Sequence, residues 1–200
     1  MDNSDRNRRS EVEEQTLQNW EERAKGEYER GDYRAAEISM RAAVEFEEAD
    51  ASTYFNLGQI LYNIGDYVGA IEAYGKSIGN IDDALINRGL CWEMVGDFGS
   101  ARQDYLAALE GEPGNVDALV NLGTLELGEG NLESAKKYLV QAVKLDEKCN
   151  WQLADVFVEA GDLKMAASVL EKAVESGESR ASSQLQEVRE QLRRRLEGGL

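Results

Sequence analysis

The residues of this 200-residue chain that best suit specific chemistry are side-chain amides that recur at matching intervals. Asn56, Asn87, Asn121 and Gln152 follow one another at steps of 31, 34 and 31 residues. An amide side chain donates and accepts hydrogen bonds at the same time, so it matches the main chain of an extended peptide. The pattern therefore predicts a surface that holds a polypeptide by its backbone. The competing interpretation, in which these amides bond neighbouring helices of the same chain, stays open at this point.

Motifs that indicate catalysis are weaker. The tripeptide Asp97-Phe98-Gly99 matches the magnesium-binding motif of protein kinases, but no glycine-rich loop, catalytic loop or strand lysine accompanies it. Gly75-Lys76-Ser77 is similar to the end of a phosphate-binding loop, but the preceding Gly69 is one residue too far away. The chain has no histidine, which removes Ser–His and Cys–His nucleophiles and histidine metal sites. We expect no enzyme activity, no catalytic residue, no metal and no cofactor.

A turn of glycine followed by an acid or amide organises the whole chain. The turn glycines are 34, 31, 34 and 31 residues apart, a period that is typical of repeat arrays. Glycine ends a helix well because it adopts positive φ, and Asp or Asn is a good N-cap for the helix that follows. The five turns are Gly31-Asp32, Gly65-Asp66, Gly96-Asp97, Gly130-Asn131 and Gly161-Asp162.

Other residue types keep fixed distances from each turn glycine, with helical spacing on both sides of it. Small residues that let two helices approach closely stand seven before the glycine (Ala24, Gly58, Gly89, Gly123, Ala154) and five after it (Ala36, Ala70, Ala101, Ala135, Ala166). Large residues that fill the space between helical pairs stand nine after it (Met40, Tyr74, Tyr105, Leu139, Leu170). Each unit is therefore predicted to be a helix, a tight turn and a helix.

One unit is nearly complete, in the residues Tyr54-Phe-Asn-Leu-Gly58, Gly65-Asp-Tyr67, Ala70, Tyr74 and Ser77. It resembles the tetratricopeptide repeat, and the resemblance covers residues 17–177. It implies an all-α, right-handed α-solenoid of five helix-turn-helix repeats, at residues 17–50, 51–81, 82–115, 116–146 and 147–177. The first repeat departs from the family pattern, with Arg23 and Glu27 where apolar residues are usual.

The two ends of the chain differ in pattern. Residues 1–16 are polar and predict a tail or a helix extension. Residues 178–200 predict a C-terminal capping helix that covers the core of the last repeat. Its apolar face consists of Ala181, Leu185, Val188, Leu192 and Leu196.

The resemblance implies that the first helix of each repeat lines a concave groove. Four offsets from the turn glycine then share one helical face and give an apolar strip flanked by acids. Such a groove suits a partner segment with apolar anchors and basic residues, although Phe55, Tyr62 and Trp151 have the alternative of packing inside the array. The predicted groove residues are Phe55, Asn56, Gln59, Tyr62, Ile86, Asn87, Leu90, Glu93, Val120, Asn121, Thr124, Trp151, Gln152 and Asp155, and the first repeat has Glu21, Glu22, Lys25 and Tyr28 at these offsets.

The net charge of −17 restricts the class of partner. An acidic field repels nucleic acid and favours basic segments, although it also serves solubility. Family members that bind the acidic tails of chaperones use a clamp of lysines, arginines and asparagines. This chain has asparagines at those positions but no basic residues, so we expect no such binding. No apolar stretch is long enough to cross a membrane and no secretory signal is recognisable. With Cys91 and Cys149 interpreted as reduced thiols, we expect a cytoplasmic protein without membrane insertion.

These features favour a protein–protein interaction module: a scaffold, an adaptor or a client-binding chaperone. Two alternatives stay open. The chain could be a self-associating structural protein, a homo-oligomer whose groove holds residues 1–14 or a neighbour's terminus. It could also be a non-catalytic regulatory subunit of a larger complex.

Overall fold

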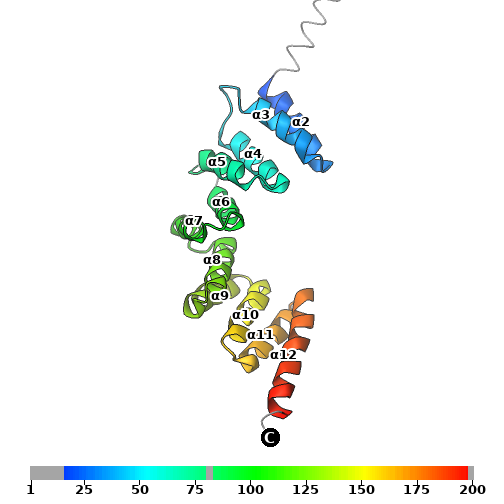
Figure 1. Ribbon diagram of the computed structural model, residues 1–200, viewed down its shortest axis with the longest axis vertical. Coiled ribbons are helices and arrows are strands. Elements are labelled where there is room, and N and C mark those ends of the chain that lie inside the picture. The colour runs from blue at the N-terminus through cyan, green and yellow to red at the C-terminus, as the bar shows by residue number, and fades with distance from the viewer. Residues whose placement is uncertain (1–15, 80–82, 198–200) are drawn as a thin grey trace, which may run out of the picture. The chain divides into compact units, whose positions relative to one another are not determined.

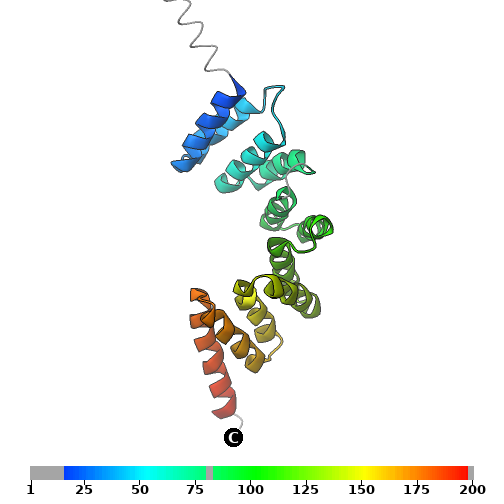
Figure 2. The same ribbon diagram turned by 180° about the vertical axis from the view of Figure 1, so that it is seen from behind.

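The computed structural model describes residues 16–79 and 83–197, and every regular element within them is a helix (Figure 1). Paired helices run side by side in both views, as α2 with α3, α4 with α5, α8 with α9 and α10 with α11 (Figures 1 and 2). The α-helices are α2 (Leu17–Glu29), α3 (Tyr33–Ala43), α4 (Ala51–Ile64), α5 (Tyr67–Ser77), α6 (Ala84–Met94), α7 (Phe98–Gly111), α8 (Val116–Gly128), α9 (Leu132–Leu145), α10 (Asn150–Glu159), α11 (Leu163–Glu175) and α12 (Ser179–Glu197); a short 3-10 helix, η1 (Glu147–Cys149), precedes α10.

The chain divides into two compact units, residues 1–104 and 105–200. The division falls inside α7, so the first unit holds α2 to α6 and the second holds α8 to α12. Four of the predicted repeat limits, after residues 50, 115, 146 and 177, lie between helical pairs. The limit after residue 81 and the predicted tail at residues 1–15 lie outside the described residues.

The same hydrogen-bonded turn closes every helical pair. The five turn glycines all have positive φ, between 74° and 89°. In each turn the backbone N–H after the glycine donates to the carbonyl oxygen five residues earlier, as Asp32 does to Glu27 at 2.9 Å and Asp66 to Leu61 at 2.9 Å. This is the Schellman arrangement, which satisfies the last carbonyl groups of the first helix. The predicted turn positions are therefore confirmed.

The predicted N-caps form capping hydrogen bonds in four of the five turns. Asp32, Asp66, Asp97 and Asp162 each accept a hydrogen bond from the backbone N–H three residues later, at 3.0 to 3.1 Å. At the fourth turn Asn131 is the N-cap residue of α9 as predicted, but its side chain makes no capping hydrogen bond. Its Nδ2 instead donates to Oε2 of the buried Glu126 at 2.8 Å.

The small residues before the turns receive large side chains from the second helix of the same pair. A Cβ atom on Gly58 would lie 2.7 Å from the ring of Tyr74, and one on Gly123 would lie 2.6 Å from Leu139. Each contact is between the small residue seven positions before the turn glycine and the large residue nine positions after it. Tyr74 is 2% exposed and Leu139 fully buried, so these pairs form part of the core of each unit.

The first helical pair replaces an apolar contact with a buried carboxylate. Glu27 is 6% exposed and accepts hydrogen bonds from Ser39 Oγ at 2.6 Å and Arg23 Nε at 3.0 Å. Burial opposes ionisation of Glu27, but these hydrogen bonds and the charges of Arg23 and Arg30 together outweigh it and leave its pKa below the usual value of 4.5. The unusual residues of the first repeat therefore bond each other, which explains why the hairpin tolerates them.

Helix α12 packs on α11 through most of its predicted face. Ala181, Leu185 and Val188 are buried, and Leu192 packs against the same core. The prediction is wrong for Leu196, which is 74% exposed, because the buried contacts of α12 end at Leu192. Arg195 Nη1 donates to the carbonyl oxygen of Gly161 at 3.0 Å.

Candidate polypeptide-binding cleft

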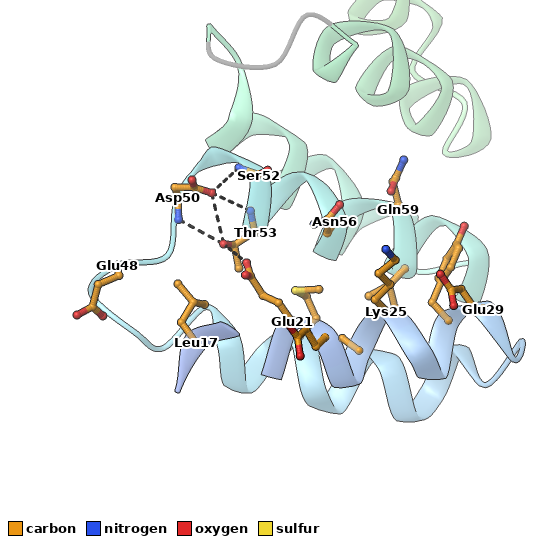
Figure 3. Close-up of a pocket in the computed structure, with 15 residues that line it drawn as sticks. Leu17, Glu21, Lys25, Glu29, Glu48, Asp50, Ser52, Thr53, Asn56 and Gln59 are labelled. Carbon is orange, nitrogen blue, oxygen red and sulfur yellow. Dashed lines mark hydrogen bonds between the residues drawn. The ribbon is translucent and has the colours of Figure 1, made fainter. Parts of the chain in front are cut away.

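A cleft of about 690 Å³ lies between the first helices of the first two repeats, α2 and α4, within the first unit (Figure 3). Helix α2 forms one wall, α4 forms the other, and the loop before α4 closes one side. The lining residues are Leu17, Glu21, Glu22, Ala24, Lys25, Tyr28, Glu29, Met40, Glu48, Asp50, Ser52, Thr53, Asn56, Gln59 and Ile60.

Two hydrogen bonds hold the walls of this cleft together. Thr53 Oγ1 on α4 donates to Glu21 Oε1 on α2 at 2.6 Å (Figure 3). Asn63 Nδ2 on α4 donates to the Tyr28 hydroxyl on α2 at 3.0 Å. Glu21 and Tyr28 are two helical turns apart, or about 10 Å along α2. The cleft is therefore fixed at two separate points, which lowers the ordering cost of binding on this side.

The cleft combines an apolar floor with an acidic rim. Ala24, Met40 and Ile60 are at most 3% exposed and form the floor. Five carboxylates and one ammonium group line the cleft, which gives a formal charge of −5 + 1 = −4. The acidic residues are Glu21, Glu22, Glu29, Glu48 and Asp50, and the basic residue is Lys25.

The predicted amides on α4 are exposed in the cleft and unengaged. Asn56 and Gln59 line it, together with the predicted first-repeat positions. Within residues 16–79 and 83–197, no hydrogen-bond partner is found for the side-chain amides of Asn56, Asn87 or Asn121. The interpretation in which these asparagines bond neighbouring helices therefore finds no contact to support it. Gln152 differs, because its Oε1 is buried without a partner in this part of the chain.

The three predicted aromatic anchors contact other side chains of the array. Phe55 packs edge-to-face on Tyr74 with 5.5 Å between ring centroids, and Tyr62 packs in the same way on Tyr67 at 5.6 Å. The guanidinium of Arg180 on α12 lies 5.6 Å from the Trp151 ring centroid. All three residues are only partly exposed, so most of their surface packs within the chain, as the alternative interpretation has it.

The remaining predicted residues are distributed over both units. On α6, Ile86 is only 6% exposed, which leaves little of it for a partner, while Asn87, Leu90 and Glu93 are partly exposed. On α8, Val120 packs against the core and its carbonyl oxygen accepts a hydrogen bond from Thr124 Oγ1 at 2.8 Å.

Asp155 on α10 is engaged by the C-terminal helix. Its carboxylate accepts a hydrogen bond from Gln184 Nε2 on α12. Burial raises the pKa of Asp155, with a further contribution from Glu159, although the hydrogen bond from Gln184 opposes this. Asp155 and Trp151 both contact side chains of α12, which leaves less of each available to a partner.

Sequence reasoning missed several residues of the cleft. Glu48 and Asp50 come from the loop between α3 and α4, which the groove offsets do not cover. Asp50 also caps α4, since its Oδ1 accepts from the N–H groups of Ser52 at 2.8 Å and Thr53 at 3.1 Å. An acid directly before a helix with Thr three residues later was the signal that could have placed it.

Other kinds of site have little support in the described part of the chain. No group of three or more acidic or cysteine side chains in residues 16–79 and 83–197 could hold a metal ion. None of the helices described there is long and apolar enough to cross a membrane. Cys91 and Cys149 are buried and unpaired, and burial raises their pKa values to about 12 and about 11. Both thiols are therefore protonated at neutral pH.

Comparison with known proteins agrees with this architecture. Two sequence profiles described as tetratricopeptide repeat match residues 22–84 and 94–152. The chain belongs to the tetratricopeptide repeat family.

Similar solved structures are proteins of the same helical-repeat fold. A MamA structure from Desulfovibrio magneticus RS-1 is 22% identical with a TM-score of 0.72, covering 80% of this chain and 93% of that one. A thermophilic TPR protein in Thermus thermophilus is 17% identical with a TM-score of 0.66, covering 86% and 98%. The prediction of an all-α fold of helix-turn-helix repeats is confirmed.

One curated relative has a catalytic name. It is the probable UDP-N-acetylglucosamine–peptide N-acetylglucosaminyltransferase SPINDLY of Solanum lycopersicum, 30% identical over 105 residues. The match takes in 50% of this chain but 11% of that protein. The chain therefore spans about a tenth of the relative's length, and the transferase activity in the name belongs to the relative.

Proposed function

We propose that this chain is a non-catalytic protein–protein interaction module, a scaffold, adaptor or client-binding chaperone, that binds a segment of a partner polypeptide in the α2–α4 cleft. One observation carries the proposal. Unengaged amides of Asn56 and Gln59 stand above an apolar floor, in a cleft whose walls are joined by hydrogen bonds. Amides can hold the partner's main chain while the floor accepts its apolar side chains. We include Asn87 and Asn121, on α6 and α8, as further amides for the same purpose.

The partner segment in this proposal carries basic and apolar side chains. The formal charge of −4 in the cleft attracts Lys and Arg and repels an acidic tail. An affinity in the micromolar range, on the order of −8 kcal/mol, is expected for one short segment. The two buried, unpaired thiols support a reducing compartment such as the cytoplasm.

A photo-crosslinking experiment tests the proposal. Gln59, exposed in the cleft, is replaced by benzoyl-phenylalanine, and the crosslinked peptides are identified by mass spectrometry. The matched control has the same group at Val68 on α5, which is 61% exposed and outside the cleft. A segment captured from Gln59 and not from Val68 is then synthesised and titrated into the full chain by calorimetry.

The decisive variant is Asn56→Ala. Loss of a single backbone hydrogen bond costs about 0.5–1.5 kcal/mol, which weakens binding of the synthetic segment by about 2- to 12-fold. Melting should stay unchanged, because no described residue bonds this amide. Gln103→Ala, an exposed amide on α7, should leave the affinity as it is. Equal capture at Val68, or unchanged affinity of Asn56→Ala, would refute the proposal.

A further inference from the structure

We propose that residues 1–15 of this chain are a built-in competitor for the α2–α4 cleft, with Arg6, Arg8 and Arg9 on its acidic rim. The inference rests on the proposed function, because it concerns the regulation of the same cleft. A partner segment would have to displace these arginines before it binds.

The charge of the cleft supplies the first argument. None of its five carboxylates forms an ion pair with any residue that the structure describes, although other acids of the first unit do, such as Glu37 with Arg41 and Asp104 with Arg88. Residues 6–9 contain three arginines and no acid. Arginine matches carboxylates well because its planar guanidinium donates two parallel hydrogen bonds.

The place where the segment joins the fold supplies the second argument. Thr16 caps α2, and Leu17, the first residue of that helix, already lines the cleft. Arg9 and Arg6 stand 8 and 11 residues before Leu17. At about 3.3–3.6 Å per residue they reach about 26–40 Å, whereas the wall from Leu17 to Glu29 is about 18 Å long. The arginines can therefore reach every part of the rim.

The tether decides whether such a contact is populated. Each exposed ion pair is weak and changes an equilibrium constant by about 1.4- to 5-fold. Three such pairs together give at most about 160-fold, or a Kd of about 6 mM, and a short covalent linker supplies an effective concentration in the millimolar range, so the contact of all three arginines is populated in part. Because the contact is electrostatic, about 1 M salt should abolish it, since screening then acts over about 3 Å. The whole segment carries three arginines against five acids, so the contact depends on residues 6–9 and not on net charge.

Paramagnetic relaxation in the full chain tests the inference without any partner. Ser4 is replaced by Cys and coupled to a nitroxide, which spares all three arginines. The label should react at position 4 and leave Cys91 and Cys149, which are buried and protonated at neutral pH. We expect loss of the amide signals of Tyr28, Asn56 and Gln59, and recovery of these signals at about 1 M salt.

Two variants of the labelled chain make the test specific. Changing all three arginines to Ala should restore the three cleft signals, whereas changing them to Lys should keep most of the loss. A cleft signal that is unaffected in the parent, or equally lost in the Ala variant, overturns the inference. The inference is also overturned if the signal loss appears when nitroxide-labelled chains are mixed with separate ¹⁵N-labelled chains that carry no nitroxide. The segment in the cleft then belongs to a second copy of the chain.

The result is distinguishable from the test of the proposed function. Relaxation loss without any crosslinked partner would show a cleft that binds only its own terminus. A crosslinked partner without relaxation loss would support the proposed function and reject the competitor.

Discussion

The contact between Gly58 and Tyr74 gives a prediction whose sign separates packing from helix propensity. In an unhindered helix interior, Gly→Ala stabilises by about 0.5–1 kcal/mol. At Gly58 the new methyl group would lie 2.7 Å from two ring carbons of Tyr74, a side chain that is 2% exposed and has no room to move. Overpacking of a core costs about 1–3 kcal/mol. We therefore expect Gly58→Ala to lower the free energy of unfolding by about 0–2.5 kcal/mol, the difference between the two effects.

Gly75→Ala is the matched control for this prediction. Gly75 is also helical, in α5, but a Cβ there would lie 3.6 Å from Nη1 of Arg88, which is an ordinary contact. This variant should be neutral or more stable by up to about 1 kcal/mol. Urea unfolding followed by far-UV circular dichroism gives both values. In a Tyr74→Leu background, Gly58→Ala should become less costly, with a coupling of about 0.5–3 kcal/mol. A Gly58→Ala variant that is more stable than the parent by as much as Gly75→Ala is would refute the packing argument.

Two further predictions concern buried charges in the first unit. Ser39→Ala removes a donor from Glu27 and should cost about 1–3 kcal/mol at pH 7. Because the pKa of Glu27 is lowered in the folded chain, this loss of stability should shrink as pH falls through that pKa, below about 4.5. The control is Ser77→Ala, which removes a hydroxyl that donates to a backbone carbonyl oxygen, and its loss of stability should not depend on pH. Urea unfolding at several pH values measures both. Arg88→Ala leaves the carboxylate of Asp104, 5% exposed, without its bonds at 2.7 and 2.6 Å and should cost about 3–5 kcal/mol in thermal unfolding. A variant that also replaces Asp104 by Leu should recover most of that loss, and failure to recover would show that the cost is packing and not the unpaired charge.

The sequence predicts the turns and the close helix contacts because their causes are local. At each turn the glycine, such as Gly65, adopts positive φ by itself. The acid that follows it, such as Asp66, accepts a hydrogen bond from a backbone N–H only three residues later. The contact of Gly58 with Tyr74 joins two positions of one hairpin, so constant offsets reveal it. The missing cap bond at Asn131 also has a local cause, since its side chain bonds the buried Glu126 five residues earlier, and only this turn combines an amide with an acid at that position.

The cleft is only partly predictable. Helical spacing places Asn56 and Gln59 on the right face, because a face of one helix follows from periodicity alone. The bond between Glu21 and Thr53 joins residues 32 positions apart at different offsets within their repeats, so the repeat pattern does not indicate it. The repeat pattern does not predict the hydrogen bond between Asp155 and Gln184 either, because Gln184 lies on α12, after the last repeat.

The turn geometry also bears on how the chain folds. In all five turns the closing bonds run between groups at most five residues apart, and the second helix begins at a cap that needs no distant partner. A single helical pair can thus form its turn before the adjacent pairs have folded. Contacts that are short in sequence cost little loop entropy, and helical proteins dominated by them fold within microseconds to milliseconds. Nucleation is therefore open to several hairpins along the chain, each of which then gives the next a surface on which to form.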